Sequence, residues 1–347
     1  MKKIMIASLS FLVLFSCTNS GENGENGTDE HSEINVYTHR HYESDQELFK
    51  LFEEQTGIQV NVINASADEL IQKISMEGSH SPADVLITVD AGRLERAKSL
   101  DLLQPIESEV LAETIPAHLR DPANQWFALT KRARVIVYDK DRVQPEQLST
   151  YEDLATDKWK GKLLTRSSEN IYNQSLMASM VVNLGEERAK EWAEGIVQNF
   201  ARTPKGSDRD QVKAVVGGEG DIAIVNSYYL GQLIHSSDPE EVRVGQQVGI
   251  FFPNQDDRGT HINISGAGVA KYAPHKENAI RFIEFLISEE AQGIFARSNY
   301  EYPVNEKVAP AELLQQWGTF KEDTLNLAEL GQNNKRAVIL MDEANWK

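Results

Sequence analysis

Tyrosines at the ends of expected strands are the residues of this chain best suited to chemistry. Tyr228 and Tyr229 are adjacent in "IVNSYYLGQLIH", residues 224–235, directly after an apolar run. Tyr42 in "THRHYESD" and Tyr172 in "RSSENIYNQS" also follow expected strands and precede expected helices. Adjacent side chains diverge within a strand, but at such a turn they can converge. Because ligands of parallel sheets bind beyond the carboxyl ends of the strands, the sequence predicts phenols that face one cleft.

Converging phenols favour a metal site. A deprotonated phenol is a hard, anionic oxygen donor, and a bound cation can deprotonate it far below its usual pKa of about 10. Ferric iron, Fe(III), is the biological ion that most favours such donors. His41, directly before Tyr42, would add a neutral imidazole, although His39 shares its face if the segment is a strand. The structural alternative, half-buried tyrosines bonded to backbone groups, stays open at this point.

Two basic residues lie near the same expected cleft. Arg132 and Arg134, in "TKRARVIVY", are two positions apart on an expected strand, so both side chains point to the same face. An arginine behind the ligands would offset the charge of several phenolates around a trivalent ion. An ordinary pair of surface residues is the alternative.

The elements that must position these residues alternate between strand and helix. Ser44 and Glu47 have the spacing of a capping box for a helix that Gly57 ends. Expected strands cover residues 33–40, 58–63, 83–90, 126–140, 161–166, 221–226, 248–254 and 261–270. Expected helices cover residues 44–57, 67–78, 92–100, 151–155, 175–184, 187–200, 230–235, 277–297, 311–317 and the last ~20 residues. This alternation is typical of an α/β fold with mainly parallel sheets.

The long strand at residues 126–140 divides the alternating pattern into two regions. We expect a first lobe of residues 34–134 and 259–309, and a second lobe of residues 135–258 and 310–347. Two crossing strands would join the lobes, the second being the return through residues 248–254 and 261–270. Two such lobes form a clamshell whose cleft can close on a solute.

The N-terminus has the pattern of an export signal. Lys2 and Lys3 precede an apolar core that is too short to span a bilayer and that ends at "LFSC". This predicts a lipoprotein signal peptide at 1–17, with lipidation of Cys17, the only cysteine of the chain. Residues 18–33 are mostly Gly, Asn and acidic residues, as in a flexible tether. A formal net charge of -18 argues against nucleic acid as a partner.

Several long motifs resemble the ferric-iron-binding proteins of ABC transporters. They are "RHYESDQELF", "SPADVLITVD", "WFALTKRARVIVYDK", "LSTYEDLATDKWKGKLLTRSSENIYNQSL", "NSYYLG", "VGIFFPNQDDRGTHINISGAGV" and "NYEYPV". The resemblance extends from about residue 34 to 305 and is strongest to the cyanobacterial, FutA-like group of extracellular solute-binding proteins. It implies a two-lobed, bacterial transferrin-like fold of the class II periplasmic-binding-protein clamshell type, without catalytic activity.

The resemblance also implies roles for single residues. Tyr42 would be a metal ligand from the first lobe, and Tyr172, Tyr228 and Tyr229 would be ligands from the second. His41 corresponds to a position that ligates in some relatives only, and Arg132 corresponds to an arginine that lies behind the ligands. This chain has Gln232 where "YYxGR" is common among relatives, so the charge of that arginine is missing at this position.

The partners follow from the same resemblance. The protein would be a monomer in the periplasm or cell envelope, lipid-anchored to a membrane, that delivers Fe(III) to an inner-membrane ABC permease. Two rivals remain at this point. One is a clamshell for an organic solute such as a polyamine or sugar, with tyrosines as stacking platforms. The other is a metal-dependent hydrolase, for which no HExxH, GxSxG or Walker A pattern is present. A structural surface lipoprotein would leave the placement of the tyrosines unexplained.

Overall fold

One mixed β-sheet runs through the part of the chain that the computed structural model describes, residues 32–40 and 42–347. The expected signal peptide with Cys17, residues 18–31 of the expected tether and His41 lie outside these described residues. The tether was expected to reach residue 33, but Glu33 already pairs with Gln59 in the sheet.

The sheet has the strand order β2-β1-β3-β8-β4-β6-β5, and β7 and β9 also pair with β4. The strands are β1 Glu33–Thr38, β2 Gln59–Asn64, β3 Val85–Val89, β4 Phe127–Asp139, β5 Leu163–Leu164, β6 Ile222–Asn226, β7 Val248–Phe251, β8 Ile262–Val269 and β9 Tyr302–Pro303. The pairs β1–β2, β1–β3 and β5–β6 are parallel, whereas all pairs that involve β4 or β8 are antiparallel. The sheet is therefore mixed, and only its two outer parts have the expected parallel order.

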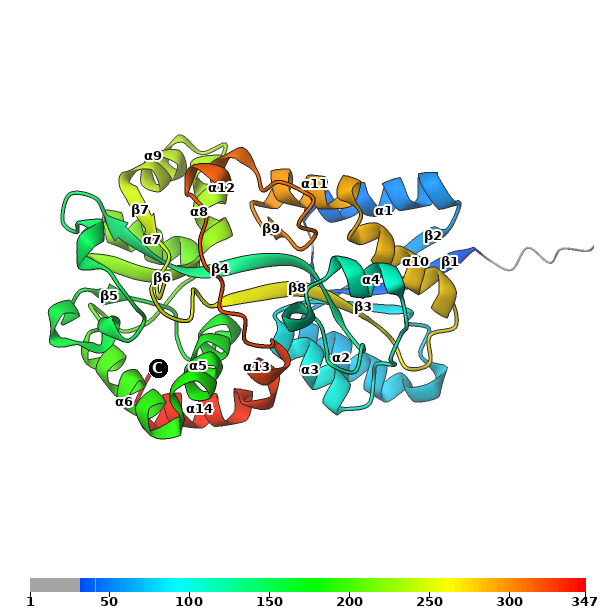
Figure 1. Ribbon diagram of the computed structural model, residues 1–347, viewed down its shortest axis with the longest axis horizontal. Coiled ribbons are helices and arrows are strands. Elements are labelled where there is room, and N and C mark those ends of the chain that lie inside the picture. Colours follow the sequence, from blue (N-terminus) through cyan, green and yellow to red (C-terminus); the bar gives the residue numbers. More distant parts are fainter. Residues whose placement is uncertain (1–31, 41) are drawn as a thin grey trace, which may run out of the picture. The chain divides into compact units, whose positions relative to one another are not determined.

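The long strand β4 connects the two halves of this sheet, of which the first contains β1, β2, β3, β8 and β9 and the second contains β5, β6 and β7. Residues Phe127 to Ala133 pair with β8 in the first half, and residues Arg134 to Tyr138 pair with β6 in the second half. Figure 1 shows β4 and β8 side by side across the middle of the molecule. Strand β7 was expected to return the chain to the first half, but it pairs with the second half of β4, so β8 alone makes the return.

Helices cover both halves. They are α1 Glu43–Thr56, α2 Ala67–Glu77, α3 Ala91–Ser99, α4 Glu109–Thr114, α5 Ile171–Leu184, α6 Glu186–Gln198, α7 Asp208–Val216, α8 Ser227–Ile234, α9 Pro239–Gln247, α10 Lys276–Leu286, α11 Glu289–Asn299, α12 Glu312–Gln316, α13 Ala328–Gln332 and α14 Asn334–Glu343. In the first half α1 to α3, α10 and α11 contact the strands, and in the second half α7 to α9 do so. Helices α5, α6 and α14 of the second half pack against one another. None of the described helices is both long enough and apolar enough to cross a membrane.

Three sequence expectations about the helices were wrong in detail. The helix expected at 277–297 is two helices, because the side chain of Ser288 caps the start of α11. Helix α1 begins one residue earlier than its expected capping box, and the Asp45 carboxylate accepts the backbone N–H of Tyr42 at 3.2 Å. The segments α4, α7 and α9 were not predicted at all.

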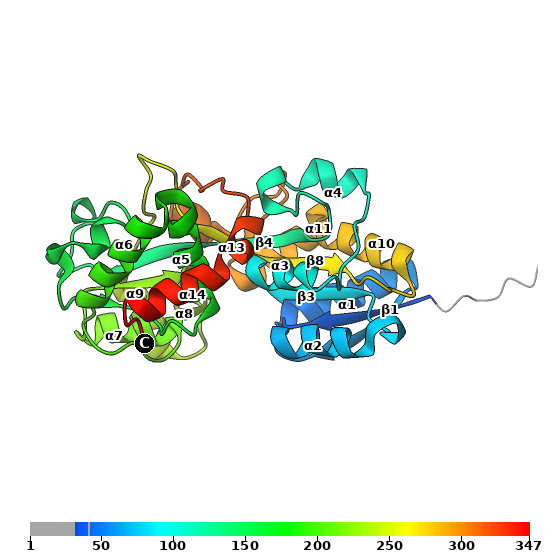
Figure 2. The same ribbon diagram turned by 90° about the horizontal axis from the view of Figure 1, so that it is seen from below.

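Helix α13, the last helix but one among the described residues, lies between the two halves. It packs against α3 of the first half and α5 of the second, as Figures 1 and 2 both show. The approach to α3 is very close, since a Cβ atom added to Gly331 would lie 2.4 Å from Cβ of the buried Glu95. Glycine at this position therefore lets the C-terminal segment contact both halves, whereas the sequence had assigned residues 310–347 to the second lobe.

We expect Gly331→Ala to destabilise the protein by about 1–3 kcal/mol, because the added methyl group overpacks the contact between α13 and α3. Urea unfolding followed by circular dichroism measures this loss. Gly217→Ala is the matched control, because a Cβ atom there would meet no atom closer than 3.4 Å and the backbone is right-handed helical. Equal stability of the two variants would contradict the close packing at Gly331.

Candidate metal site

The four candidate tyrosines all lie where helices begin. Tyr42 directly precedes α1, Tyr172 lies in the first turn of α5, and Tyr228 and Tyr229 lie in the first turn of α8. The sequence had placed the last three in loops before the helices. The difference matters because side chains in a helix lean toward its N-terminus, so the rings project past the helix start. The partial positive charge of a helix N-terminus also favours a nearby anionic oxygen.

The structure brings the four phenols together. The hydroxyl oxygens of Tyr172 and Tyr228 are 3.5 Å apart, and the ring centroids of Tyr228 and Tyr229 are 4.2 Å apart. A pocket of about 270 Å³ is lined by His39, Arg40, Tyr42, Val89, Tyr172, Arg209, Tyr229 and Gln232. Tyr228 is almost fully buried beside Tyr172. Phenols from distant parts of the sequence therefore share one focus, and their role as metal ligands stays a prediction.

The phenols of Tyr42, Tyr228 and Tyr229 resist ionisation while no cation is present. Burial, followed by the charge of Glu301, raises the pKa of Tyr42 to about 12, although Arg40 acts in the opposite direction. Burial also raises the pKa values of Tyr228 and Tyr229, and each is raised further by the neighbouring Tyr172. The hydroxyl groups therefore stay protonated near neutral pH until a cation displaces their protons.

Arg132 and Arg134 are buried beside Tyr172 and are not surface residues. Their guanidinium carbons lie 5.6 and 5.9 Å from the centre of the Tyr172 ring. Arg134 donates to the Asp208 carboxylate at 3.1 Å, which offsets its charge. Arg132 lies 3.9 Å from Glu301, so this ion pair is longer and weaker, and burial acts to lower the pKa of Arg132. Ionised phenols at Tyr172 and Tyr228 would raise the pKa of Arg132, so its positive charge would stabilise phenolates that form at the site.

A second charged pair at the site was not predicted from the sequence. Arg40, in the turn between β1 and α1, lies 4.9 Å from the centre of the Tyr42 ring and donates to Glu301 at 3.1 Å. Its position between two histidines in "HRHY" was the one available signal. Glu301 is distant in sequence, so no local pattern could have indicated the pairing.

Gln232 lines the pocket, and its side chain contacts that of an arginine. Arg209, from the first turn of α7, donates from Nη2 to Oε1 of Gln232 at 2.8 Å. Both residues line the phenol pocket. A guanidinium group is therefore present on this side of the pocket although residue 232 is not the arginine of the "YYxGR" pattern. His39 lines the pocket as well, so the expected competitor of His41 is near the site.

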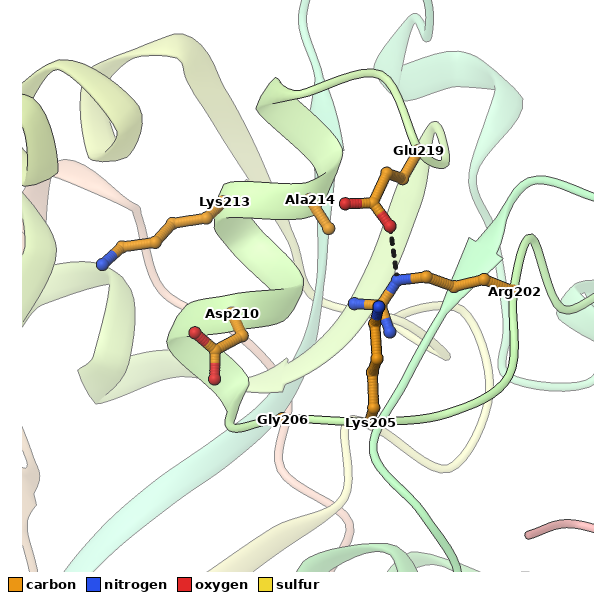
Figure 3. Close-up of a pocket in the computed structure, with 7 residues that line it drawn as sticks. All are labelled: Arg202, Lys205, Gly206, Asp210, Lys213, Ala214 and Glu219. Carbon is orange, nitrogen blue, oxygen red and sulfur yellow. Dashed lines mark ion pairs between the residues drawn. The ribbon is translucent and has the colours of Figure 1, made fainter.

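Another cavity in the described residues is less suited to a hard cation. A pocket of about 400 Å³ beside α7 is lined mainly by Arg202, Lys205, Lys213, Asp210 and Glu219 (Figure 3). Arg202 pairs with Glu219 at 2.8 Å, and Asp210 accepts hydrogen bonds from Ser207, so both carboxylates are already in use. No group of three or more His, Cys, Asp or Glu side chains within residues 32–40 and 42–347 has the arrangement of a metal site. Among the described side chains, the phenols thus stay the candidate donors for such an ion.

A buried aspartate connects the two halves next to the phenol pocket. Asp90 follows β3, and its carboxylate accepts hydrogen bonds from Gly92 N at 2.8 Å, from Ser175 Oγ at 2.7 Å and from Asn263 Nδ2 at 2.7 Å. Ser175 belongs to α5 of the second half, three residues after Tyr172. The φ angle of Asp90 is 95°, a conformation that residues other than glycine rarely adopt. This contact fixes the start of α5 against the first half.

Comparison with known proteins identifies the class to which this fold and site belong. The family of bacterial extracellular solute-binding proteins matches residues 80–321, so the chain belongs to that family. Solved structures similar to this chain include ferric-binding proteins with a two-lobed fold, and the fold described above is of this kind.

Relatives with high sequence identity to this chain are iron proteins. The chain is 52% identical to iron uptake protein A1 of Synechocystis sp. over 318 residues, which are 92% of this chain and 88% of that protein. It is 54% identical to FutA (IdiA) of Trichodesmium, solved in complex with iron and citrate, with a TM-score of 0.89 over 91% of this chain and 100% of that chain. The ferric binding protein of Campylobacter jejuni is 46% identical, with a TM-score of 0.86 over 90% of this chain and 100% of that one. These relatives confirm the resemblance to FutA-like proteins.

We expect Ser175→Ala to lower stability by roughly 1.5–3 kcal/mol near neutral pH, because the substitution removes a hydrogen bond to a buried carboxylate. Burial already raises the pKa of Asp90, so its folded form binds a proton more readily than its unfolded form. Stability from this group therefore increases as the pH falls through the raised pKa, and the loss in Ser175→Ala should be smaller at acidic pH than near neutral pH.

Urea unfolding at the two pH values measures this difference. Ser179→Ala is the matched control, because Ser179 is also buried in α5 but its hydroxyl donates to Leu176 O, which does not titrate. A loss in Ser175→Ala that is the same at both pH values would contradict the assigned role of the Asp90 charge.

Proposed function

We propose that this protein captures Fe(III) in the pocket between its two lobes and delivers the ion to an ABC-transporter permease for iron uptake. The observation that carries the proposal is the convergence of phenols from three helix starts, including the 3.5 Å approach of the Tyr172 and Tyr228 hydroxyls. The iron uptake proteins of Synechocystis and the iron complex of Trichodesmium FutA support it. In this proposal Tyr42, Tyr172, Tyr228 and Tyr229 are the protein ligands, and His41 is a fifth.

The chemistry of the pocket suits a trivalent cargo. Phenols with raised pKa values ionise only when a strong Lewis acid replaces their protons, and ferric iron is such an acid at neutral pH. Arg132 then offsets part of the accumulated negative charge. A divalent ion would compensate the phenolate charge less well. The balance of charges therefore favours Fe(III) over divalent ions, and protonation or reduction would loosen the cargo.

Capture and release would use the connection between the halves. We propose a first lobe of residues 34–134 and 259–309 and a second lobe of residues 135–258 and 310–347, with β4 and β8 as the hinge strands. Tyr42 comes from the first lobe and the other three tyrosines from the second, so opening the lobes would divide the ligand set. Closure would then be stabilised by the ion itself, as in other ligand-driven hinge motions.

The cellular setting belongs to the same proposal. The signal pattern that ends at Cys17 supports export, removal of the residues that precede Cys17 and attachment of a lipid to Cys17. The following Gly-, Asn- and acid-rich residues would tether the binding domain to a membrane of the cell envelope. The protein would act there as a monomer without catalytic activity, with an inner-membrane ABC permease as its partner.

Ferric iron, supplied as the citrate complex, should give the purified protein a visible phenolate-to-iron charge-transfer band with about one iron per chain. Tyr229→Phe should weaken this band sharply and lower the retained iron, because the variant loses one anionic oxygen donor. Tyr272→Phe is the control, since Tyr272 is exposed and lies outside the pocket. Metal analysis and visible spectroscopy test this, and an unchanged band with full iron content in Tyr229→Phe would remove Tyr229 from the ligand set.

Replacement of Cys17 tests the anchor separately. We expect Cys17→Ser to abolish labelling by a fatty-acid precursor and to move the protein from the membrane fraction to the soluble fraction, because serine offers no thiol for lipid attachment. Cell fractionation and metabolic labelling measure both effects. Iron binding by the variant should stay unchanged, and retention of the lipid label would contradict the assignment of Cys17.

A further inference from the structure

Arg40 occupies an unusual position for a charged residue. It is 2% exposed, and its guanidinium group lies between two aromatic rings, 4.9 Å from the centre of the Tyr42 ring and 5.0 Å from that of Phe295. An arginine over an aromatic face is attracted by the ring, and the attraction is stronger where water is excluded. Arg40 thereby holds the ring of the phenol that the first lobe presents to the pocket.

The guanidinium group is itself fixed by three partners. Arg40 Nε donates to Asp45 at 3.1 Å, and Nη1 donates to Ser265 Oγ at 2.6 Å and to Glu301 at 3.1 Å. Asp45 belongs to α1, and Ser265 belongs to β8. The orientation of Arg40 over Tyr42 is therefore determined by side chains from distant parts of the chain.

The same network reaches the tyrosines of the second half. Arg132 Nη1 donates to Ser265 Oγ at 3.2 Å and lies 3.9 Å from Glu301. Arg132 also lies 5.6 Å from the centre of the Tyr172 ring. Ser265 and Glu301 thus stand between two arginines, one of which faces Tyr42 and the other Tyr172.

This network contains two buried cations and two buried anions. Arg40, Arg132, Asp45 and Glu301 are all 4% exposed or less. Replacing buried ion pairs by apolar residues is often neutral or stabilising, so such a network is weak evidence for a role in stability. Its place against two phenols of the pocket points instead to a role in the electrostatics of the site.

We propose that Arg40 and Glu301 are positioning residues that adjust how strongly Tyr42 donates electrons to the bound ferric ion. Arg40 holds the ring and withdraws electron density by its positive charge, whereas Glu301 partly cancels that charge. The inference rests on the proposed function, in which Tyr42 is a ligand of Fe(III). It concerns the charge next to the proposed ligand Tyr42.

The two charges predict shifts of opposite sign. Arg40→Met removes a positive charge, so the phenolate becomes a stronger donor, the charge-transfer band moves to longer wavelength and the Fe(III)/Fe(II) potential becomes more negative. Glu301→Gln removes a negative charge but keeps the size of the side chain and an oxygen that accepts from Arg40. In that variant the band should move to shorter wavelength and the potential should become more positive.

The experiment compares visible spectra and reduction potentials of the iron-loaded full chain in wild type, Arg40→Met and Glu301→Gln. The matched controls are Arg258→Met and Glu152→Gln, which break an ion pair of 2.6 Å that is also partly buried but lies outside the phenol pocket. Both controls should leave the band and the potential unchanged. If Arg40→Met does not fold, Glu301→Gln alone still tests the sign of its shift.

Opposite shifts in the two variants, with unchanged controls, would establish the inference, because loosened packing alone would not change sign with the charge removed. Unshifted bands, shifts in the same direction, or a shift of Glu301→Gln to longer wavelength would overturn it. In each of those cases a wild-type protein that still binds iron with full colour would leave the proposed function intact. A wild-type protein that takes up no ferric iron would instead refute the proposed function and this inference with it.

Discussion

The site depends on phenol hydroxyls that are held close together in a place where they do not ionise by themselves. Burial and mutual proximity raise the pKa values of Tyr228 and Tyr229, and burial with the charge of Glu301 raises that of Tyr42. Such a pocket is poorly suited to neutral solutes that need ionised partners. It is well suited to a cation that is strong enough to displace phenolic protons. Helix starts and arginines around the pocket would reduce the electrostatic cost of phenolates formed in this way.

The phenols belong to two halves of the protein, so the requirement that they lie close together is also a requirement on the arrangement of the halves. Tyr42 follows β1 in the first half, whereas the other three phenols belong to α5 and α8 of the second. Only β4 pairs with strands of both halves in the described sheet, and Arg132 and Arg134 lie on either side of the point where its partners change. The guanidinium groups of Arg132 and Arg134 therefore belong to β4, the strand about which the halves would move.

The sequence predicted that the four phenols lie close together because the signal for them is local. A run of apolar residues followed by tyrosine and a helix pattern occurs three times, and each occurrence lies where the structure places a phenol of the pocket. The helix starts were predicted less well, since Tyr172 and Tyr228 lie inside the first turn and not before it. Helix boundaries depend on capping contacts such as Asn170 Oδ1 with Tyr172 N, which periodicity does not report.

Features that depend on distant contacts were not predictable from local patterns. Glu301 in "NYEYPV" and Arg40 in "HRHY" each look like solvated charges, yet they meet in the core. The two helices α10 and α11 were predicted as one because their apolar faces continue across Ser288. The position of α13 against α3 depends on the missing side chain of Gly331, which has meaning only once Glu95 is known to lie opposite it.

Gln232 departs from the family pattern at one position, and the charge of the site cannot be inferred from that position alone. The family resemblance implies an arginine at this position, so the amide of Gln232 suggests a site with less positive charge. The structure places Arg209 in contact with that amide and in the lining of the same pocket, so a guanidinium group remains on this side. Arg209 also lies 3.7 Å from Glu241, so part of its charge is offset. The charge around a set of ligands is therefore a property of the assembled pocket, and it has to be counted over all side chains that face the ligands and not at one aligned position.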